Sequence, residues 1–147
     1  MLIDQTRIRR LIPHCGTMCL LDRVTAWDAK NIQCRAVSHR DSGNPLRRDG
    51  RLSAICGVEY AAQAMALHGA LNRNRGQSQR AGYLASLRNV ACHVADLATS
   101  GDELTVEAKL LLGDGNRVIY AFEVHCNRTP LVCGRAAVVL GGSGARG

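Results

Sequence analysis

Apolar and polar residues alternate along the last third of the chain, which is the pattern of half-buried strands. In "ELTVEAKLLL" the apolar positions run in steps of two from Leu104 to Leu110, and "RVIYAFEVHC" alternates in the same way after the turn "GDGN". A period of two turns one face of each segment toward a core. With "GYLASLRNVACHVADL" before them and "LVCGRAAVVL" after them, these segments predict about four antiparallel strands joined as hairpins.

The first part of the chain predicts a short helix followed by a hairpin. Residues 5–12 ("QTRIRRLI") suit a helix that ends before the proline, since proline cannot continue a helix. Residues 20–38 predict two strands around a turn, and in the second of them Ile32, Cys34 and Ala36 share one face.

A polar loop and one long helix fill the middle of the chain. Residues 39–52 ("HRDSGNPLRRDGRL") have the glycines and proline of a loop, and residues 53–73 hold mostly good helix formers. Ser53 is the predicted N-cap and Gly76 the predicted stop. Many positions of this helix are Ala or Gly, so a sheet can approach its backbone closely. A curved antiparallel sheet around such a helix is the hot-dog fold, of the α+β class, and its unpaired edges commonly join a second subunit.

The length and composition are those of one globular domain. Residues 1–140 are predicted to form it, and the tail "GGSGARG" (141–147) is expected to be disordered. Hydrophobic residues make up 46% of the chain and charged residues 21%, as in ordinary soluble proteins. No apolar run approaches the roughly 20 residues of a membrane helix, and no signal-peptide pattern is present, so a cytoplasmic protein is expected.

The positive charge of the chain comes almost entirely from arginine. The formal net charge is +7, and 17 of the 19 basic residues are arginines. Arg47, Arg48 and Arg51 cluster just before the long helix, where they would either attract an anionic partner or lie on a solvated surface. Nucleic acid is not expected as that partner, because no binding motif is present and only one Phe and one Trp are available for stacking.

The seven cysteines do not form a metal-binding pattern. Cys15 and Cys19 are four residues apart, but no second pair of Cys or His stands at the spacing of a zinc site. Most of the cysteines have apolar neighbours in the sequence. They are therefore predicted to be small buried thiols in a reducing compartment, and no metal site is expected.

Three segments resemble the bacterial β-hydroxyacyl-ACP dehydratases of the FabZ type. Residues 8–24 ("IRRLIPHCGTMCLLDRV") match ten positions of the opening I-x-x-L-[LI]-P-H-R-x-P-x-L-L-x-D-R-V, with Cys15 in place of its Arg. "EYAAQ" (59–63) fits the pattern E-A-x-A-Q, and "DELTVEAKLL" (102–111) resembles G-D-x-L-x-x-E-x-x-L. More closely, "NPLRRDGRL", "GVEYAAQAMALHG" and "GYL" are similar to the dehydratase-like proteins of aryl polyene and related lipid clusters.

The resemblance implies an oligomeric hot-dog enzyme that acts on 3-hydroxyacyl groups carried by acyl carrier protein. It gives Glu59 the role of general acid toward the departing 3-hydroxyl, while a His of the facing subunit removes the C2 proton. Substrate contacts are expected from backbone N–H groups near Cys56 and Gly57, from Gln63 as the residue that orients Glu59, and from His14. Without the resemblance, Glu59 would equally suit a solvent-facing residue or half of a structural ion pair.

The sequence departs from the family at the catalytic His. The family carries it fourteen residues before the Glu, where this chain has Pro45, and the nearest His is His39 in "HRDSGNP", twenty residues before. Two interpretations follow. Either the loop is re-spaced and His39 is the base, or the site has lost its base.

Three functions therefore stay open. The first is a 3-hydroxyacyl-ACP dehydratase that uses Glu59 and His39. The second is a catalytically impaired subunit that pairs with an active paralogue and docks the carrier protein through the arginines before the helix. The third is a thioesterase in which the helix carboxylate directs water. No cofactor is implied, and the expected partners are acyl carrier protein and a second hot-dog chain, identical or paralogous.

Overall fold

The computed structural model describes residues 2–12, 18–73, 82–99 and 101–140. Its helices are α1 (Gln5–Leu11) and α2 (Gly57–Leu71), and its strands are β1 (Ile3–Asp4), β2 (Arg23–Trp27), β3 (Asn31–Ala36), β4 (Gly82–Cys92), β5 (Leu104–Asp114), β6 (Arg117–Cys126) and β7 (Thr129–Leu140). Three short 3-10 turns, η2 (Ser38–Arg40), η3 (Ala54–Cys56) and η4 (Leu97–Thr99), complete the set. The predicted tail and the predicted stop at Gly76 lie outside the described residues. No helix in the described part of the chain is long and apolar enough to span a membrane.

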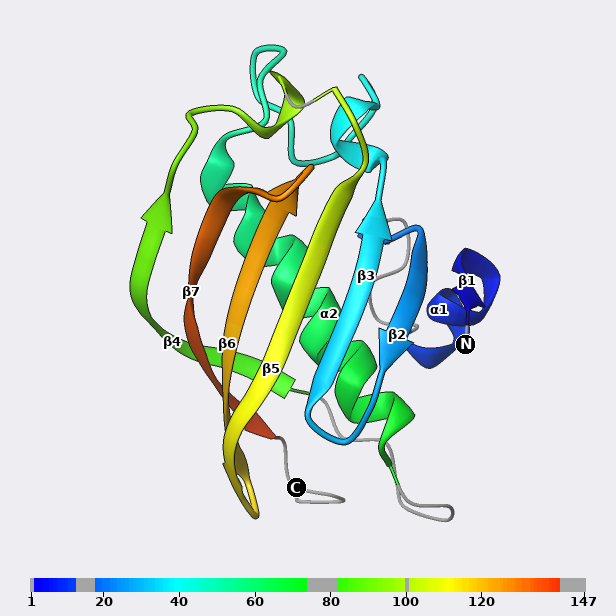
Figure 1. The fold of residues 1–147 in the computed structure, drawn as a ribbon, viewed down its shortest axis with the longest axis vertical. Coiled ribbons are helices and arrows are strands. Elements are labelled where there is room, and N and C mark those ends of the chain that lie inside the picture. Colours follow the sequence, from blue (N-terminus) through cyan, green and yellow to red (C-terminus); the bar gives the residue numbers. More distant parts are fainter. Residues whose placement is uncertain (1, 13–17, 74–81, 100, 141–147) are drawn as a thin grey trace.

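All the strands form one antiparallel sheet in the order β1-β2-β3-β5-β6-β7-β4. Helix α2 lies across one face of this sheet and packs against β3, β5 and β6 (Figure 1). The predicted alternation is confirmed, because Leu104, Val106 and Ala108 on β5 all enter the core. The predicted face of the first hairpin, with Ile32 and Cys34, enters the same core. The architecture is the expected helix wrapped by a curved sheet.

Helix α2 approaches the sheet closely at its first residue, Gly57. A Cβ atom at this position would lie 3.0 Å from Cγ2 of Val132 on β7 and 3.6 Å from Cγ2 of Val124 on β6. The 3.0 Å distance to Val132 is shorter than ordinary van der Waals contact, so glycine is the residue that permits the approach. Gly57 thus provides the close approach between helix and sheet that the small residues of α2 predicted.

The predicted N-cap of the long helix is wrong. Ser53 has an extended ψ of 141°, its side chain makes no capping hydrogen bond, and a 3-10 turn separates it from α2. The physical reason is a competing pairing: Ser53 bridges to Asp96, and the N–H of Ala54 donates to the carbonyl of Ala95 at 3.0 Å. This tertiary pairing holds the chain extended and delays the helix to Gly57.

His68 fastens the end of α2 to the β2–β3 turn. It is buried, and its Nε2 lies 2.9 Å from the carbonyl oxygen of Asp28, which can only accept. Nε2 therefore carries the proton, and Nδ1 accepts from the hydroxyl of Tyr120 at 2.7 Å. Burial lowers the pKa of His68, and the smaller effects of Asp28 act in the opposite direction.

The expectation of buried thiols holds for two of the six described cysteines. Cys34 and Cys126 are buried, Cys92 is exposed, and Cys19, Cys56 and Cys133 lie between; all six are free thiols. Burial raises the pKa of Cys34 to about 12, which leaves it a protonated core residue. The sequence neighbours of Cys92 are apolar, but it lies on the edge strand β4, where one side of the strand has no cover.

We expect Gly57→Ala to lower the free energy of unfolding by about 1–3 kcal/mol, because the new methyl group overpacks against Val132. The matched control is Gly69→Ala in the same helix, where a Cβ meets nothing within 4 Å. This control should raise stability by about 0.5–1 kcal/mol through helix propensity. Urea unfolding of the two variants measures both effects. Equal effects would show that the close approach at Gly57 does not exist.

We also expect stability to fall as the pH drops through the ordinary histidine value of 6.5, because the unfolded chain takes up a proton that folded His68 resists. The contribution is present above that value and is lost below it. Unfolding free energies measured between about pH 8 and pH 5 should show this slope, above the range in which carboxylates titrate. His68→Gln should flatten the slope, and the exposed control His93→Gln should leave it unchanged. An equal slope in His68→Gln would contradict the assignment.

Candidate active site

Glu59 is the acid that the start of α2 turns away from the core. It is exposed in the first turn of the helix, while Val58, Tyr60 and Ala61 beside it are buried. Within the described part of the chain its carboxylate has no hydrogen-bond or ion-pair partner. The ion pair that the sequence left open as an alternative for Glu59 is therefore absent from these residues.

The thiol of Cys56, at the start of α2, is influenced by the charges of both Glu59 and Arg48. Burial and the charge of Glu59 both raise the pKa of the Cys56 thiol, and the charge of Arg48 opposes them. Ile55, the neighbour of Cys56, is an apolar residue with 50% of its surface exposed. An exposed carboxylate, an exposed apolar side chain and an arginine thus border the start of α2.

Tyr60 connects the loop after β3 to the start of α2. Its hydroxyl lies 2.8 Å from Oγ of Ser38 and accepts from Nδ2 of Asn44 at 3.1 Å. The same Asn44 amide group donates to the carbonyl of Ser38 at 2.9 Å. Burial is the main reason that the pKa of Tyr60 is raised. Sequence reasoning missed this residue, although its place beside Glu59 in "EYAAQ" was a signal.

His39 lies in this loop and is completely buried. The contact between Ser38 and Tyr60 shows that the re-spaced loop does return to the start of α2. However, a side chain with no accessible surface cannot touch a substrate without a movement of the loop. A catalytic role for His39 stays a prediction.

Gln63 does not hold Glu59, contrary to expectation. Its Oε1 accepts from the N–H of Leu20 at 2.9 Å, and its Nε2 donates to the carbonyl of Met18 at 2.5 Å. Both bonds fasten the segment before β2 to α2, and they occupy the amide group of the side chain. His14, the other predicted substrate contact from this region, lies outside the described residues.

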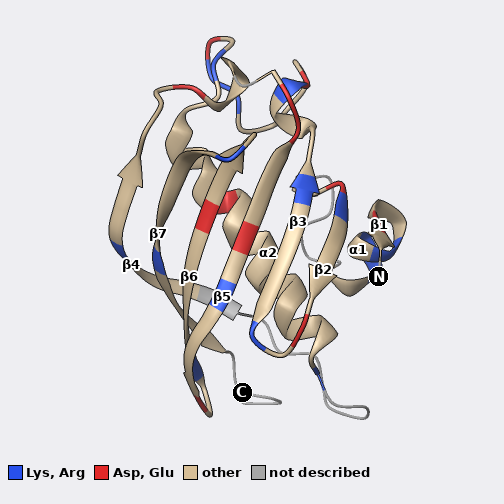
Figure 2. Cartoon of the chain, viewed as in Figure 1, with Lys and Arg blue, Asp and Glu red and all other residues tan. Residues whose placement is uncertain are grey.

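The three arginines before α2 divide into two kinds. Arg47 donates to three carbonyls, those of His39, Asp41 and Gly50, at 2.9–3.0 Å, so it organises the loop. Arg48 and Arg51 are exposed and pair across a tight turn whose central residues have φ of 53° and 75°. Basic segments are visible in this loop in Figure 2. Arg48 also donates to the carbonyls of Arg47 at 3.0 Å and Pro45 at 3.4 Å. Arg48 and Arg51 are nevertheless exposed and can be reached by a partner, whereas Arg47 is half-buried.

The edge strand β4 leaves part of the sheet open near this site. β4 is paired with β7 alone, and Leu84 and Leu87 on it are 43% and 38% exposed. The start of α2 lies on the β4 side of the sheet, and its end lies on the β2–β3 side (Figure 1).

The only described residues with the spacing of metal ligands lie elsewhere in the fold. Glu107, Glu123 and His125 come from β5 and β6, on the face of the sheet away from α2. The sequence predicted no metal site because its criterion was spacing along one segment, and these ligands meet across two strands. The polar residues on the outward face of these two predicted strands could have indicated the group in the sequence.

In the single chain, Glu59 is an acid with no base placed beside it among the described residues. The carboxyl group of Glu59 can give a proton to, or take one from, a molecule at the start of α2. No histidine of the described residues is placed by a hydrogen bond or ion pair beside it. An elimination needs a base as well as an acid, so the arrangement is half of an acid–base pair.

Comparisons with known proteins agree with this geometry. A family model described as ApeP-like, ApeP dehydratase, matches residues 6–141. A chain of the dehydratase heterocomplex ApeI:P from Xenorhabdus doucetiae is 28% identical and superposes with a TM-score of 0.82, over 92% of this chain and 91% of that one. A thioesterase family protein from Silicibacter pomeroyi (10% identity, TM-score 0.68, 94% and 98% covered) and a mutant thioesterase from Pseudomonas aeruginosa (12%, 0.65, 94% and 94%) share the fold. No curated protein sequence matches significantly. The expected hot-dog fold is confirmed.

Proposed function

The chain belongs to the ApeP-like dehydratase family, and we propose that it takes part in the dehydration of a carrier-bound 3-hydroxyacyl thioester to its trans-2-enoyl form during aryl polyene biosynthesis. The observation that carries the proposal is Glu59, an exposed carboxyl group in the first turn of α2 without a partner in the described chain. The structural ion pair that the sequence left open for Glu59 is absent from the described residues. A catalytic acid has to stay open to its substrate.

The proposed step is an elimination beside a thioester. A base removes the proton from C2, the electron pair of that C–H bond forms the C2–C3 double bond, and the C3–O bond breaks. Protonated Glu59 gives its proton to the departing hydroxyl, which leaves as water. Glu59 must be neutral to do so, and exclusion of water by a covering subunit favours the neutral acid.

We further propose that a second hot-dog subunit covers Glu59 and supplies the base. Three observations support a partner at this place: the open edge of β4, the exposed leucines on it, and the exposure of Glu59 itself. The similarity to a chain of a dehydratase heterocomplex supports a partner of a different sequence. The burial of His39 supports a base supplied by another subunit, because the histidine in the loop before α2 is not accessible.

The carrier protein is proposed to dock at Arg48 and Arg51. Both guanidinium groups are exposed, and the charge of Arg48 acts on Cys56 at the start of α2. An acidic carrier that binds there would deliver its phosphopantetheine arm toward Glu59. Thioesterase activity, the third function left open by the sequence, has support from the fold alone.

We expect Glu59→Gln to lower kcat for dehydration by about 10²–10⁴, because glutamine keeps the shape of the side chain and cannot give up a proton in the same way. Formation of the enoyl thioester from a 3-hydroxyacyl-carrier substrate measures this effect, with the chain purified alone and with any subunit that co-purifies. Asp114→Asn removes an exposed carboxylate at the β5–β6 turn and is the matched control, for which unchanged turnover is expected.

Full activity of Glu59→Gln in the complex would overturn the role of Glu59. Activity of the chain alone, abolished by His39→Ala in a variant that keeps its melting temperature, would instead make His39 the base and remove the need for a partner. Free thiol released without enoyl product would favour the thioesterase function.

Replacement of both Arg48 and Arg51 by Ala should raise KM for a carrier-bound substrate on the order of three- to tenfold at low salt, with kcat retained. The effect should shrink as salt screens the charges. Arg47→Ala is the contrasting variant. It should lower the free energy of unfolding by about 1–3 kcal/mol, because three carbonyls lose their donor. An equal KM for wild type and the double variant would exclude docking at this turn.

A further inference from the structure

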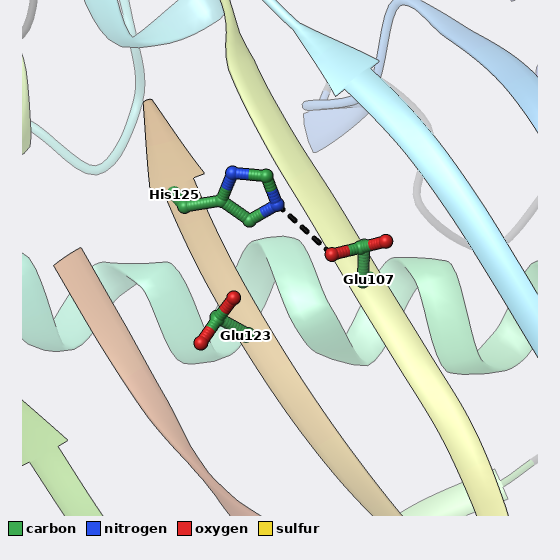
Figure 3. A group of neighbouring side chains, drawn as sticks. All are labelled: Glu107, Glu123 and His125. Carbon is green, nitrogen blue, oxygen red and sulfur yellow. Dashed lines mark hydrogen bonds and ion pairs between the residues drawn. The ribbon is translucent and has the colours of Figure 1, made fainter. Parts of the chain in front are cut away.

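A histidine and two glutamates gather on the face of the sheet away from α2. Along β5 and β6 the residues that enter the core alternate with residues that face outward, and Glu107, Glu123 and His125 belong to the outward set. Figure 3 shows the three side chains on neighbouring strands, with α2 behind the sheet. All three are half-buried, and they lie on the opposite face of the sheet from the start of α2.

The ligand atoms of the group are close enough to share one ion. One nitrogen or oxygen of each residue lies within 4.8 Å of those of the other two, and Nε2 of His125 is 2.9 Å from Oε1 of Glu107. Ligand atoms around a zinc ion at about 2.0–2.2 Å lie roughly 3–4 Å apart, so small side-chain rotations suffice. The two strands that carry them lie in the interior of the sheet, which is a rigid support.

The group has an uncompensated negative charge. Glu107 and Glu123 are direct cross-strand partners, and two carboxylates in that position repel each other. Adjacent acidic segments are visible on β5 and β6 in Figure 2. His125 bonds Glu107, while Glu123 has neither a hydrogen bond nor an ion pair with any described residue. A bound cation would remove the repulsion and give Glu123 a partner.

A second layer of residues orients the first. The free oxygen of Glu107, Oε2, accepts a hydrogen bond from Nε2 of Gln33 on β3 at 3.1 Å. Oε1 of Gln33 in turn accepts from the hydroxyl of Thr25 on β2 at 2.8 Å. This chain of bonds crosses three neighbouring strands and fixes the carboxylate of Glu107. Outer residues that hold a ligand in this way are a regular feature of metal sites.

The group also borders an open space. A hollow of about 600 Å³ in the sheet is lined by both glutamates together with Trp27, Gln33, Lys109 and Ala121, among other residues. Ala121 lies opposite Lys109 in the strand register, and its small side chain leaves room beside Glu123. An ion held by three protein ligands here would keep a coordination position open toward the hollow.

We propose that Glu107, Glu123 and His125 form a binding site for a divalent transition-metal ion of the Zn²⁺ class. Imidazole nitrogen with carboxylate oxygen is a zinc donor set, whereas Mg²⁺ and Ca²⁺ are bound by oxygen ligands alone. The site links β5 to β6 and presents the ion to the hollow. It is independent of Glu59, so failure of one proposal leaves the other standing.

The test is titration of the tag-free chain with Zn²⁺ by calorimetry, together with the visible absorption of bound Co²⁺ as the spectroscopic signature. The wild type should bind one Zn²⁺ more than His125→Gln or Glu123→Gln, or bind it at least about tenfold more tightly. Gln33→Ala should weaken binding on the order of tenfold through the loss of orientation. Mg²⁺ in excess should not displace Zn²⁺. His93→Gln removes an exposed histidine outside the group and is the control, with unchanged binding expected.

Glu123→Gln also distinguishes the loss of a metal ligand from the loss of the folded structure. Because this substitution removes the repulsion between the glutamates, its metal-free melting temperature should equal or exceed that of the wild type. Zinc binding that is the same in wild type, His125→Gln and Glu123→Gln would overturn the proposal. Loss of binding in His93→Gln alone, or displacement by Mg²⁺, would overturn it equally.

Discussion

The gap between the start of α2 and strands β6 and β7 is the constraint on which the site depends. It is so narrow that a Cβ at Gly57 would lie 3.0 Å from a methyl group of Val132. With the helix backbone held at that distance, its rotation is fixed by which residues fill the core. Tyr60 then points inward to Ser38 and Asn44, and Glu59 points outward. The loop that carries His39 is therefore placed by the same contact.

The two faces of the sheet differ because core-facing and outward-facing residues mostly alternate along β5 and β6. The face toward α2 is apolar and supplies the core, so it cannot hold charged groups without partners. Polar residues are confined to the outer face, where neighbouring strands bring Glu107 opposite Glu123. The sheet thus lies between the helix that carries Glu59 and the glutamates of the outer face.

The edge strand β4 and the start of α2 expose apolar side chains on the single chain. Glu59 and the apolar residue Ile55 are exposed around the start of α2, and Leu84 and Leu87 are exposed on the edge strand β4. Register shifts along β4 mark bulges, which bend an edge strand and increase its twist. An open sheet edge with exposed apolar side chains is a surface that suits binding of a second chain.

Local pattern determined most of the architecture: alternation located β3, β5 and β6, and the small residues of α2 implied a helix against a closely fitting sheet. Glu59 was found in the same way, as the one acid on an otherwise apolar and small-residue segment. Tertiary contacts decided the rest. Pairing of Ser53 with Asp96 delayed α2, hydrogen bonds to Met18 and Leu20 took Gln63 away from Glu59, and a register shift between Leu110 and Leu112 brought Glu107 opposite Glu123. Periodicity depends on neighbours within a few residues, so a single sequence reveals it. The partner of a side chain can lie forty residues away, and only the packed chain selects it.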